Sequence, residues 1–276
     1  MADGRILVIV IRTPNSDRYL PIDTMLKNDK RFELEYIEAS MTPTYHDVRS
    51  RNISYSTEIF EYFHGRKLTP AEIGCADSHN KARKLIQNQS DGGIILEDDA
   101  RIINIDSFFV IASKFLSSQN LNRSILNLTG FRQIGLENSN HELQKNDRYV
   151  KLWGSPDLAV SYALTKKAAT ELLKTNQPII DVSDWPATQC NYFVPLVPVV
   201  RHGDFNTLSL IDSSASNFRN SSSSGRDLLG LFFLKFFMKK PKYVNFTVFF
   251  NTVYVKRIKW RADFLKIKIC LEILNK

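Results

Sequence analysis

The chain has 276 residues, 43% hydrophobic and 24% charged, which are ordinary values for a globular protein and sufficient for one large α/β domain with an appendage. Its three cysteines, Cys75, Cys190 and Cys270, are far apart and form no C-x-x-C pair, so their spacing suggests neither a disulfide framework nor a structural zinc site and favours reduced thiols in a cytosolic protein. The net charge of +8 is uneven: residues 226–276 hold twelve Lys/Arg against three Asp/Glu, a net +9, and residues 1–225 hold 25 against 26, a net −1.

The first part of the chain alternates strand and helix signals. Arg5–Ile11 predicts a buried strand, because its six apolar residues are too few for the centre of a signal peptide. The polar residues 15–17 are candidates to cap a helix that runs to about Asn28. Phe32–Ile37 alternates apolar and charged residues, which predicts a second strand.

The clearest helix start in the sequence lies at Thr69. Thr69 can cap the helix, Pro70 takes its first position and Glu72 completes a capping box, so we expect a helix to about Gln89. Residues 91–93 predict a turn, and residues 94–96 a short, fully apolar strand. Strands and helices in this order predict a mostly parallel sheet covered by helices on both faces.

Three carboxylates, Glu97, Asp98 and Asp99, directly follow that strand. Because side chains alternate along a strand, we expect Glu97 and Asp99 on one side and Asp98 on the other. Their mutual repulsion is relieved by a hard divalent cation with oxygen ligands, and ligands bind open α/β sheets at the carboxyl ends of strands. The triplet therefore indicates a cation site, with a solvated acidic turn as the alternative.

The end of the chain is basic and aromatic. The polar residues 220–225 predict a flexible link between a domain of residues 1–225 and a segment of residues 226–276. The apolar run Leu228–Met238 is too short to span about 30 Å of hydrocarbon, but together with the cations and tryptophan of Lys256–Arg261 it fits an anionic membrane surface. The alternative is a helical layer packed on the domain. The segment carries no nucleic-acid-binding motif, so we expect no nucleic-acid partner.

Two stretches, Leu68–His79 and Ile94–Ala100, closely resemble glycosyltransferase family 25, which includes lipooligosaccharide and collagen galactosyltransferases. The family pairs a helix of the first sequence with a strand that ends in Glu-Asp-Asp. Further likenesses extend the resemblance to about residues 5–205, at residues 9–18, 38–40, 161–173, 181–185 and 198–202. Residues 154–157 depart from the family pattern, and residues beyond about 226 match none of it.

The resemblance implies a GT-A-like, Rossmann-type αβα sandwich that binds a nucleotide sugar, with Mn²⁺ or Mg²⁺ as cofactor. The implied reaction transfers a hexose, galactose from UDP-galactose, to a lipooligosaccharide or lipopolysaccharide acceptor with inversion. Such an enzyme would work in the cytoplasm, on the inner face of the membrane that holds its glycolipid acceptor. The chemistry fits the triplet, because a cation held by carboxylates stabilises the charge that develops on a leaving diphosphate.

The resemblance also assigns roles to residues. Asp99 is the expected direct metal ligand, with Glu97 and His202 as further candidates, and Glu97 or Asp98 would alternatively hold the ribose or a metal-bound water. His202 follows an apolar strand predicted over Val197–Val200 and is otherwise a plain surface histidine.

The base that takes the proton from the acceptor hydroxyl is expected to be Asp184, with Asp181 as second choice. Asp184 could instead cap a helix at Trp185, and it could do both. His79 is expected to orient the site from below or touch a phosphate, or else to be a satisfied core histidine. Arg12 and Arg18 would meet the uridine or diphosphate, unless they are solvated cations.

Two other classes of function compete with the transferase. A metal-dependent phosphohydrolase also places acidic residues at strand ends, but it would normally carry further Asp/His clusters. A non-catalytic, basic membrane-binding protein explains residues 226–276, but it does not explain the helix followed by the carboxylate triplet.

Overall fold

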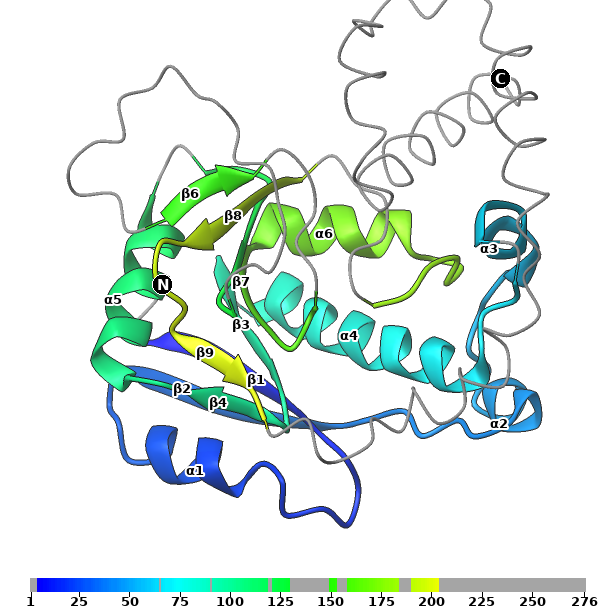
Figure 1. Ribbon diagram of the computed structural model, residues 1–276, viewed down its shortest axis with the longest axis horizontal. Helices are drawn as coiled ribbons and strands as arrows, with labels where there is room; N and C mark the ends of the chain where they lie inside the picture. The colour runs from blue at the N-terminus through cyan, green and yellow to red at the C-terminus, as the bar shows by residue number, and fades with distance from the viewer. Residues whose placement is uncertain are drawn as a thin grey trace, which may run out of the picture.

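The computed structural model describes residues 4–64, 66–89, 91–118, 121–129, 149–152, 158–183 and 190–203. Over this part the chain forms an α/β sandwich in which helices cover both faces of one central sheet (Figure 1). The fold class predicted from the sequence is therefore confirmed. Residues 220–225 and 226–276, the predicted link and basic segment, lie outside the described residues.

The central sheet has seven strands in the order β2-β1-β3-β7-β5-β8-β6. Three neighbouring pairs are parallel (β1 with β2, β1 with β3, β5 with β8), and β7 and β6 pair antiparallel with their neighbours. Five strands thus run in one direction, as predicted for a mostly parallel sheet. The strands span β1 Ile6–Arg12, β2 Phe32–Glu38, β3 Gly92–Glu97, β5 Ser124–Asn127, β6 Tyr149–Leu152, β7 Ser161–Thr165 and β8 Asn191–Pro195.

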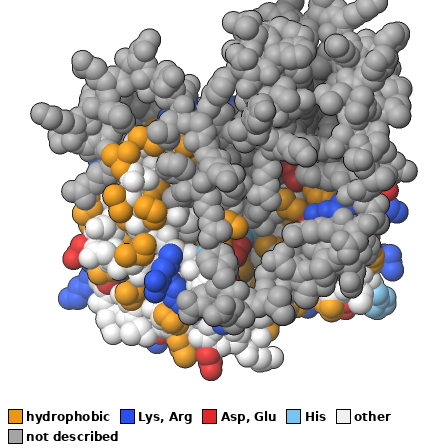
Figure 2. All heavy atoms as spheres, in the orientation of Figure 1, with side chains coloured by type: hydrophobic (Ala, Val, Ile, Leu, Met, Phe, Trp, Pro, Cys, Tyr) orange, Lys and Arg blue, Asp and Glu red, His pale blue; other side chains and the backbone are white. Residues whose placement is uncertain are grey.

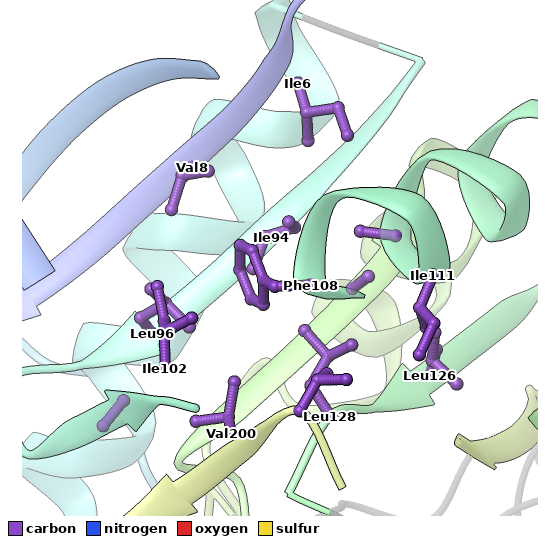
Figure 3. Packing of buried hydrophobic residues seen from close by; sticks show 14 of the residues in the cluster. Ile6, Val8, Ile94, Leu96, Ile102, Phe108, Ile111, Leu126, Leu128 and Val200 are labelled. Atoms are coloured by element: carbon purple, nitrogen blue, oxygen red, sulfur yellow. The ribbon is translucent and has the colours of Figure 1, made fainter. Parts of the chain in front are cut away.

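Strand β1 shows how the two faces are covered, since its alternate side chains enter two different cores. Ile6, Val8 and Val10 pack with apolar residues of α1 (Leu20–Leu26) and α5 (Ile105–Ser117), as Figure 3 shows for part of this cluster. Leu7, Ile9 and Ile11 instead pack with α4 (Pro70–Gln89) and α6 (Lys166–Thr175). The continuous apolar run of this strand is therefore explained by burial on both faces.

Helix α4 begins as the sequence predicts. The Thr69 hydroxyl accepts the Glu72 N–H at 3.2 Å, and the Glu72 carboxylate accepts the Thr69 N–H at 2.8 Å. This reciprocal capping box satisfies two donors that a helix start otherwise leaves without partners. Arg66 adds two hydrogen bonds to the same carboxylate, at 2.8 and 2.6 Å.

Gly74 lets α4 approach the chain that follows β2. A Cβ at this position would overlap the Ser40 carbonyl oxygen and the Thr42 hydroxyl. The Ser40 N–H donates to the Ser78 hydroxyl at 2.8 Å across the same contact. The smaller helices α2 (Tyr45–Ser50) and α3 (Thr57–His64) follow this segment.

Two local predictions are wrong. Helix α1 begins only at Leu20, its N-cap is Tyr19, and no side chain caps it, so residues 15–17 do not have the predicted role. The apolar stretch from Val197 does not form a strand until Val200, and Val197 is 70% exposed. Residues 196–198 are exposed in the connection between β8 and that strand, whereas Val199 already packs in the core.

A second, two-stranded sheet pairs β4 (Ala100–Ile102) with β9 (Val200–His202) in antiparallel register. The pairing sets Ala100 opposite His202. It therefore brings the carboxylate triplet, which immediately precedes β4, next to the histidine at the end of β9.

No helix within the described residues combines the length and apolar character that crossing a bilayer requires.

Candidate functional site

The carboxylate triplet lies at the carboxyl end of β3, but its side chains do not alternate as predicted. Strand β3 ends at Glu97, and Asp98 and Asp99 form the turn that leads into β4. Both aspartates contact Arg18, whereas Glu97 contacts His79. The strand rule fails here because it holds only while the chain remains extended.

Asp98 and Asp99 are held by the loop that follows β1. The Thr13 N–H donates to Asp98 Oδ2 at 2.9 Å, and Arg18 Nε lies 3.5 Å from Asp98 Oδ1. The Arg18 guanidinium also donates to Asp99 Oδ2. Asp98 is buried, so this guanidinium offsets the repulsion between two carboxylates that water cannot fully screen. Arg18, expected at the uridine or diphosphate, thus lies on the carboxylates themselves.

His202 lies beside Asp99, with its Nε2 3.4 Å from Asp99 Oδ2. Its Nδ1 lies 3.0 Å from the Gly203 carbonyl oxygen. Gly203 in turn donates its N–H to the Asp99 carbonyl oxygen at 2.7 Å, and a Cβ at this position would lie 2.8 Å from that oxygen. Glycine is therefore required for β9 to end so close to the turn.

Asp99 has the features of a cation ligand. Its second carboxylate oxygen, Oδ1, is buried and has no hydrogen-bond partner among the described residues. A buried carboxylate oxygen normally has a partner, and a hard divalent cation would supply one. The structure thus brings two of the three predicted metal ligands, Asp99 and His202, side by side, and their donor atoms fit such an ion.

Arg101 fixes the turn from outside. Its guanidinium donates to three backbone carbonyls, those of Arg18 at 3.3 Å, Asp98 at 3.2 Å and Ala100 at 2.9 Å. It ties the loop after β1 to the turn after β3. Sequence reasoning did not identify this residue, because backbone carbonyls carry no sequence signal.

Glu97, the third predicted ligand, lies at one end of a buried polar chain. His79 Nε2 lies 2.9 Å from Glu97 Oε1, and His79 Nδ1 lies 3.0 Å from the Tyr162 hydroxyl. Arg83, which is fully buried, donates from Nε to the same hydroxyl at 3.2 Å. Burial raises the pKa of Tyr162 to about 12, so its hydroxyl stays protonated. His79 is thus buried in the core and contacts Glu97, and its expected role in orienting the site stays a prediction.

Cys75, one turn before His79 on α4, belongs to the same neighbourhood. One ligand atom from each of Cys75, His79 and Glu97 lies within 4.8 Å of the other two. Cys75 and Cys190 form no disulfide among the described residues, and Cys270 lies outside them. Sequence reasoning missed Cys75 as a site residue, although its spacing of four from His79 was a usable signal.

Arg12 ends β1 between two aromatic rings. Its guanidinium carbon lies 5.6 Å from the centre of the Tyr19 ring and 5.7 Å from that of Tyr36, and Glu38 lies 3.9 Å away. Burial and the neighbouring Asp23 raise the pKa of Tyr36. Arg12 is 37% exposed at its side chain, so it is accessible to a ligand at this edge of the sheet.

Of the two candidate bases, the structure describes Asp181 but not Asp184. Asp181 is buried, and its carboxylate accepts the Val182 N–H at 2.8 Å. Asp184 lies outside the described residues. Ser183, the residue before it, places its hydroxyl 3.1 Å from the Cys75 thiol and accepts Arg83 at its carbonyl oxygen. The chain that leads to Asp184 therefore runs past Cys75 of α4.

Comparison with known families gives one extended match. The sequence profile described as glycosyltransferase family 25 (LPS biosynthesis protein) matches residues 15–187. This range includes the helix α4, the carboxylate triplet and both candidate bases. No curated protein sequence matches the chain.

Solved structures show distant likenesses. The galactosyltransferase LgtC in complex with donor and acceptor sugar analogues is 12% identical, with a TM-score of 0.32, over 62% of this chain and 63% of that one. The glycosyltransferase GlyE of Streptococcus pneumoniae TIGR4 is 7% identical, with a TM-score of 0.38, over 88% of this chain and 66% of that one. An active-site mutant of LgtC is 10% identical, with a TM-score of 0.37, over 82% and 99%. The chain thus spans just under two thirds of the first two structures, and the scores are too low to define a shared fold.

Proposed function

Since the chain belongs to glycosyltransferase family 25, we propose that it transfers galactose from UDP-galactose to the oligosaccharide of a bacterial lipooligosaccharide or lipopolysaccharide, with inversion at the sugar's C1. The observation that carries this proposal is the turn after β3, where Arg18 contacts both Asp98 and Asp99 and one buried oxygen of Asp99 has no hydrogen-bond partner within the described part of the chain. Such a site suits a cation and the diphosphate of a nucleotide sugar.

Manganese is the proposed cofactor, with magnesium as the alternative. Asp99 and His202 would hold it, because His202 Nε2 lies 3.4 Å from Asp99 Oδ2 and the other oxygen, Oδ1, has no hydrogen-bond partner among the residues that the structure describes. When bound, such an ion neutralises the negative charge that accumulates on the departing diphosphate. Glu97 is turned toward His79, so the proposal does not make it a ligand of this ion.

The arginines bind and orient the donor in this proposal. Arg18 lies beside both aspartates, so its positive charge is close to where a diphosphate would sit. Arg12 and the rings of Tyr19 and Tyr36 form an aromatic and cationic edge at the end of β1. Such an edge suits a planar uracil ring, which can stack on aromatic and guanidinium faces.

The base is proposed to be Asp184, with Asp181 as the second choice. Inversion requires one carboxylate to take the proton of the acceptor hydroxyl as that oxygen attacks C1 from the face opposite the diphosphate. Asp181 is buried and already accepts a backbone N–H, which favours a structural role. Asp184 follows Ser183, which contacts Cys75 next to Glu97.

The direct test is an assay of transfer. The full chain is incubated with Mn²⁺, UDP-galactose and a lipooligosaccharide acceptor that lacks its terminal sugar, and the product is analysed by NMR. We expect one added galactose in β linkage, the inverted configuration relative to the α-linked donor. An α-linked product would contradict inversion, and no transfer from any UDP-hexose would contradict the proposed function.

A further inference from the structure

Cys75, His79 and Glu97 form a group of potential metal ligands apart from Asp99 and His202. Among the residues that the structure describes, they are the one set of three or more Cys, His, Asp or Glu side chains whose ligand atoms all lie within 4.8 Å of one another. The proposed hard-cation site does not use Cys75 or His79. Cys75, His79 and Glu97 are therefore considered as a separate metal site.

The backbone presents these side chains from two rigid elements. Cys75 and His79 are four residues apart on α4, so they lie on the same face of the helix. Glu97 is the last residue of β3. Ligands on regular elements hold their spacing better than ligands on loops, which suits a defined metal geometry.

Tyr162 holds the His79 ring from its far side. The Tyr162 hydroxyl lies 3.0 Å from His79 Nδ1, and the two rings stack with centroids 5.8 Å apart and planes 21° apart. A tyrosine hydroxyl can donate to this nitrogen or accept from it, so it fits either neutral tautomer. With the proton on Nδ1, the Nε2 lone pair points toward the cluster. Metal-binding histidines are commonly held in this way through their second nitrogen.

We propose that Cys75, His79 and Glu97 bind one Zn²⁺ ion, at a site distinct from the one at Asp99 and His202. A thiolate, an imidazole and a carboxylate are zinc ligands, and the thiolate disfavours Mg²⁺ and Mn²⁺. Zinc bonds of about 2.0–2.3 Å place tetrahedral ligand atoms about 3.3–3.8 Å apart. The present spacing, within 4.8 Å, reaches that range by small side-chain movements, with a proton released from Cys75 on binding.

The three ligands leave a fourth position for water or a neighbouring hydroxyl. The Ser183 hydroxyl, 3.1 Å from the Cys75 sulfur, is the neighbouring hydroxyl that the proposal considers. A bound ion would tie α4 to the end of β3, immediately before Asp98. It would thereby fix Glu97 and help define the turn on which the hard-cation site depends.

Cobalt is the probe for this site, because tetrahedral Co²⁺ with a thiolate ligand has a sulfur-to-metal charge-transfer band in the near ultraviolet. The full chain, stripped of metal with a chelator, is titrated with Co²⁺. We expect one equivalent to produce the band and one equivalent of Zn²⁺ to abolish it. Cys75→Ser should lose the band. Cys190→Ala, which removes a buried thiol elsewhere, and Asp99→Asn should keep it, and Tyr162→Phe should weaken cobalt binding about 10–100-fold.

A second readout needs no variant. Zn²⁺ should slow alkylation of Cys75 in the unaltered protein, measured by mass spectrometry of the peptide that contains it, while Mg²⁺ should not. Absence of the charge-transfer band, its persistence in Cys75→Ser, or alkylation of Cys75 at the same rate with and without Zn²⁺ would each overturn the proposal. Because neither readout depends on sugar transfer, failure here would leave the proposed function standing, and the reverse also holds.

Discussion

Tyr162 connects the buried polar side chains next to the site, because it contacts both His79 and Arg83. Its hydroxyl lies between His79 Nδ1 and the Nε of Arg83, and all three side chains are fully or almost fully buried. Removing one partner from buried polar groups typically costs about 1–3 kcal/mol. The hydroxyl therefore matters more for stability than its small size indicates.

We expect Tyr162→Phe to lower the free energy of unfolding by about 1–3 kcal/mol, since His79 and Arg83 each lose one hydrogen bond in the core. Chemical denaturation followed by circular dichroism measures this change. A double-mutant cycle with His79→Gln should show coupling of about 0.5 kcal/mol or more. Strictly additive effects would mean that the contact between Tyr162 and His79 contributes nothing of its own.

The proposed base, Asp184, can be tested by a single substitution. Asp184→Asn should leave the affinity for UDP-galactose unchanged and lower kcat about 10²–10⁴-fold, because a base acts on the acceptor proton only as the bond forms. Isothermal titration with the donor and steady-state kinetics separate the two quantities. Asp181→Asn is the matched comparison. If it lowers kcat while Asp184→Asn does not, the role belongs to Asp181.

Helix α4 begins with a buried carboxylate, Glu72, that both Arg66 and Thr69 contact. Glu72 is 6% exposed, yet the pKa of its carboxyl is lowered. Desolvation alone would raise that pKa, but the hydrogen bonds and charge of Arg66, with those of Thr69, outweigh it. The lowered pKa means that ionised Glu72 stabilises the folded state.

Glu72→Gln should therefore lower the free energy of unfolding by about 2 kcal/mol at pH 7. Because the folded pKa lies below the ordinary value of 4.5, the contribution is fully present above that pH and is lost as the pH falls through the folded pKa. Unfolding curves at several pH values should show the difference from the unaltered protein shrink below about pH 4.5.

Glu58→Gln is the control for this prediction. Glu58 also has a lowered pKa, from a hydrogen bond with Ser56, but it is exposed at the surface. Its replacement should change stability little at any pH. An effect as large as that of Glu72→Gln would show that charge, and not the buried capping box, is responsible.

Local signals made some elements predictable from the sequence. Strand β1, strand β2 and helix α4 were predicted within two residues of their observed ends, since apolar periodicity and a capping box are encoded in neighbouring residues. The start of α1 was not, because Tyr19 occupies the N-cap without a side-chain hydrogen bond. Pro21 and Asp23 in its first turn are typical of a helix start, but the polar residues 15–17 offered better N-cap side chains and favoured an earlier start.

The site was predictable in part, for a similar reason. Composition and spacing identified the carboxylates, and the resemblance indicated His202 and His79. Three sets of contacts could not be predicted. Arg18 contacts both aspartates, and Arg101 contacts backbone carbonyls. Glu97 contacts His79, although it was expected on the same side as Asp99. The first two depend on the turn that follows β3 and on the loop after β1, and the third on the packing of α4 against the end of β3; all join segments that meet only in the folded chain.

Charge is the main feature at the scale of the whole molecule. On the face in view, the visible Lys/Arg and Asp/Glu side chains of the described part lie among polar and apolar ones (Figure 2). Residues 1–225 carry a net charge of −1. Residues 226–276, with a net +9 and the apolar run Leu228–Met238, differ sharply from them. We propose that this segment binds the membrane surface that carries the glycolipid acceptor.

The full chain should co-sediment with vesicles that contain anionic lipid at low salt and be partly released at high salt, because salt screens such charges over about 10 Å at 0.1 M. Replacing Lys239, Lys240 and Lys242 together by Gln should weaken this binding. A chain ending at Gly225 should lose it, and should also lose activity on lipid-linked acceptor while binding UDP-galactose normally.

Matched controls on the neutral part of the chain are Lys84 and Lys174, both of which lie within residues 1–225. Their replacement by Gln should not alter vesicle binding. If the full chain ignores anionic vesicles at every salt concentration, or the chain ending at Gly225 does not fold, residues 226–276 pack on the domain instead.

A cation at Asp99 that supports nucleotide-sugar binding is tested most directly by thermal unfolding of the unaltered protein and of Asp99→Asn, each with Mn²⁺ and a panel of nucleotide sugars. UDP-galactose at 100 times its Kd should stabilise the unaltered protein by about 2.7 kcal/mol. UDP-glucose at the same concentration should stabilise it less. Asp99→Asn should unfold near the same temperature without ligand and gain no stability from Mn²⁺ and UDP-galactose together. Equal stabilisation of both proteins, or none of the unaltered protein by any nucleotide sugar, would contradict the account.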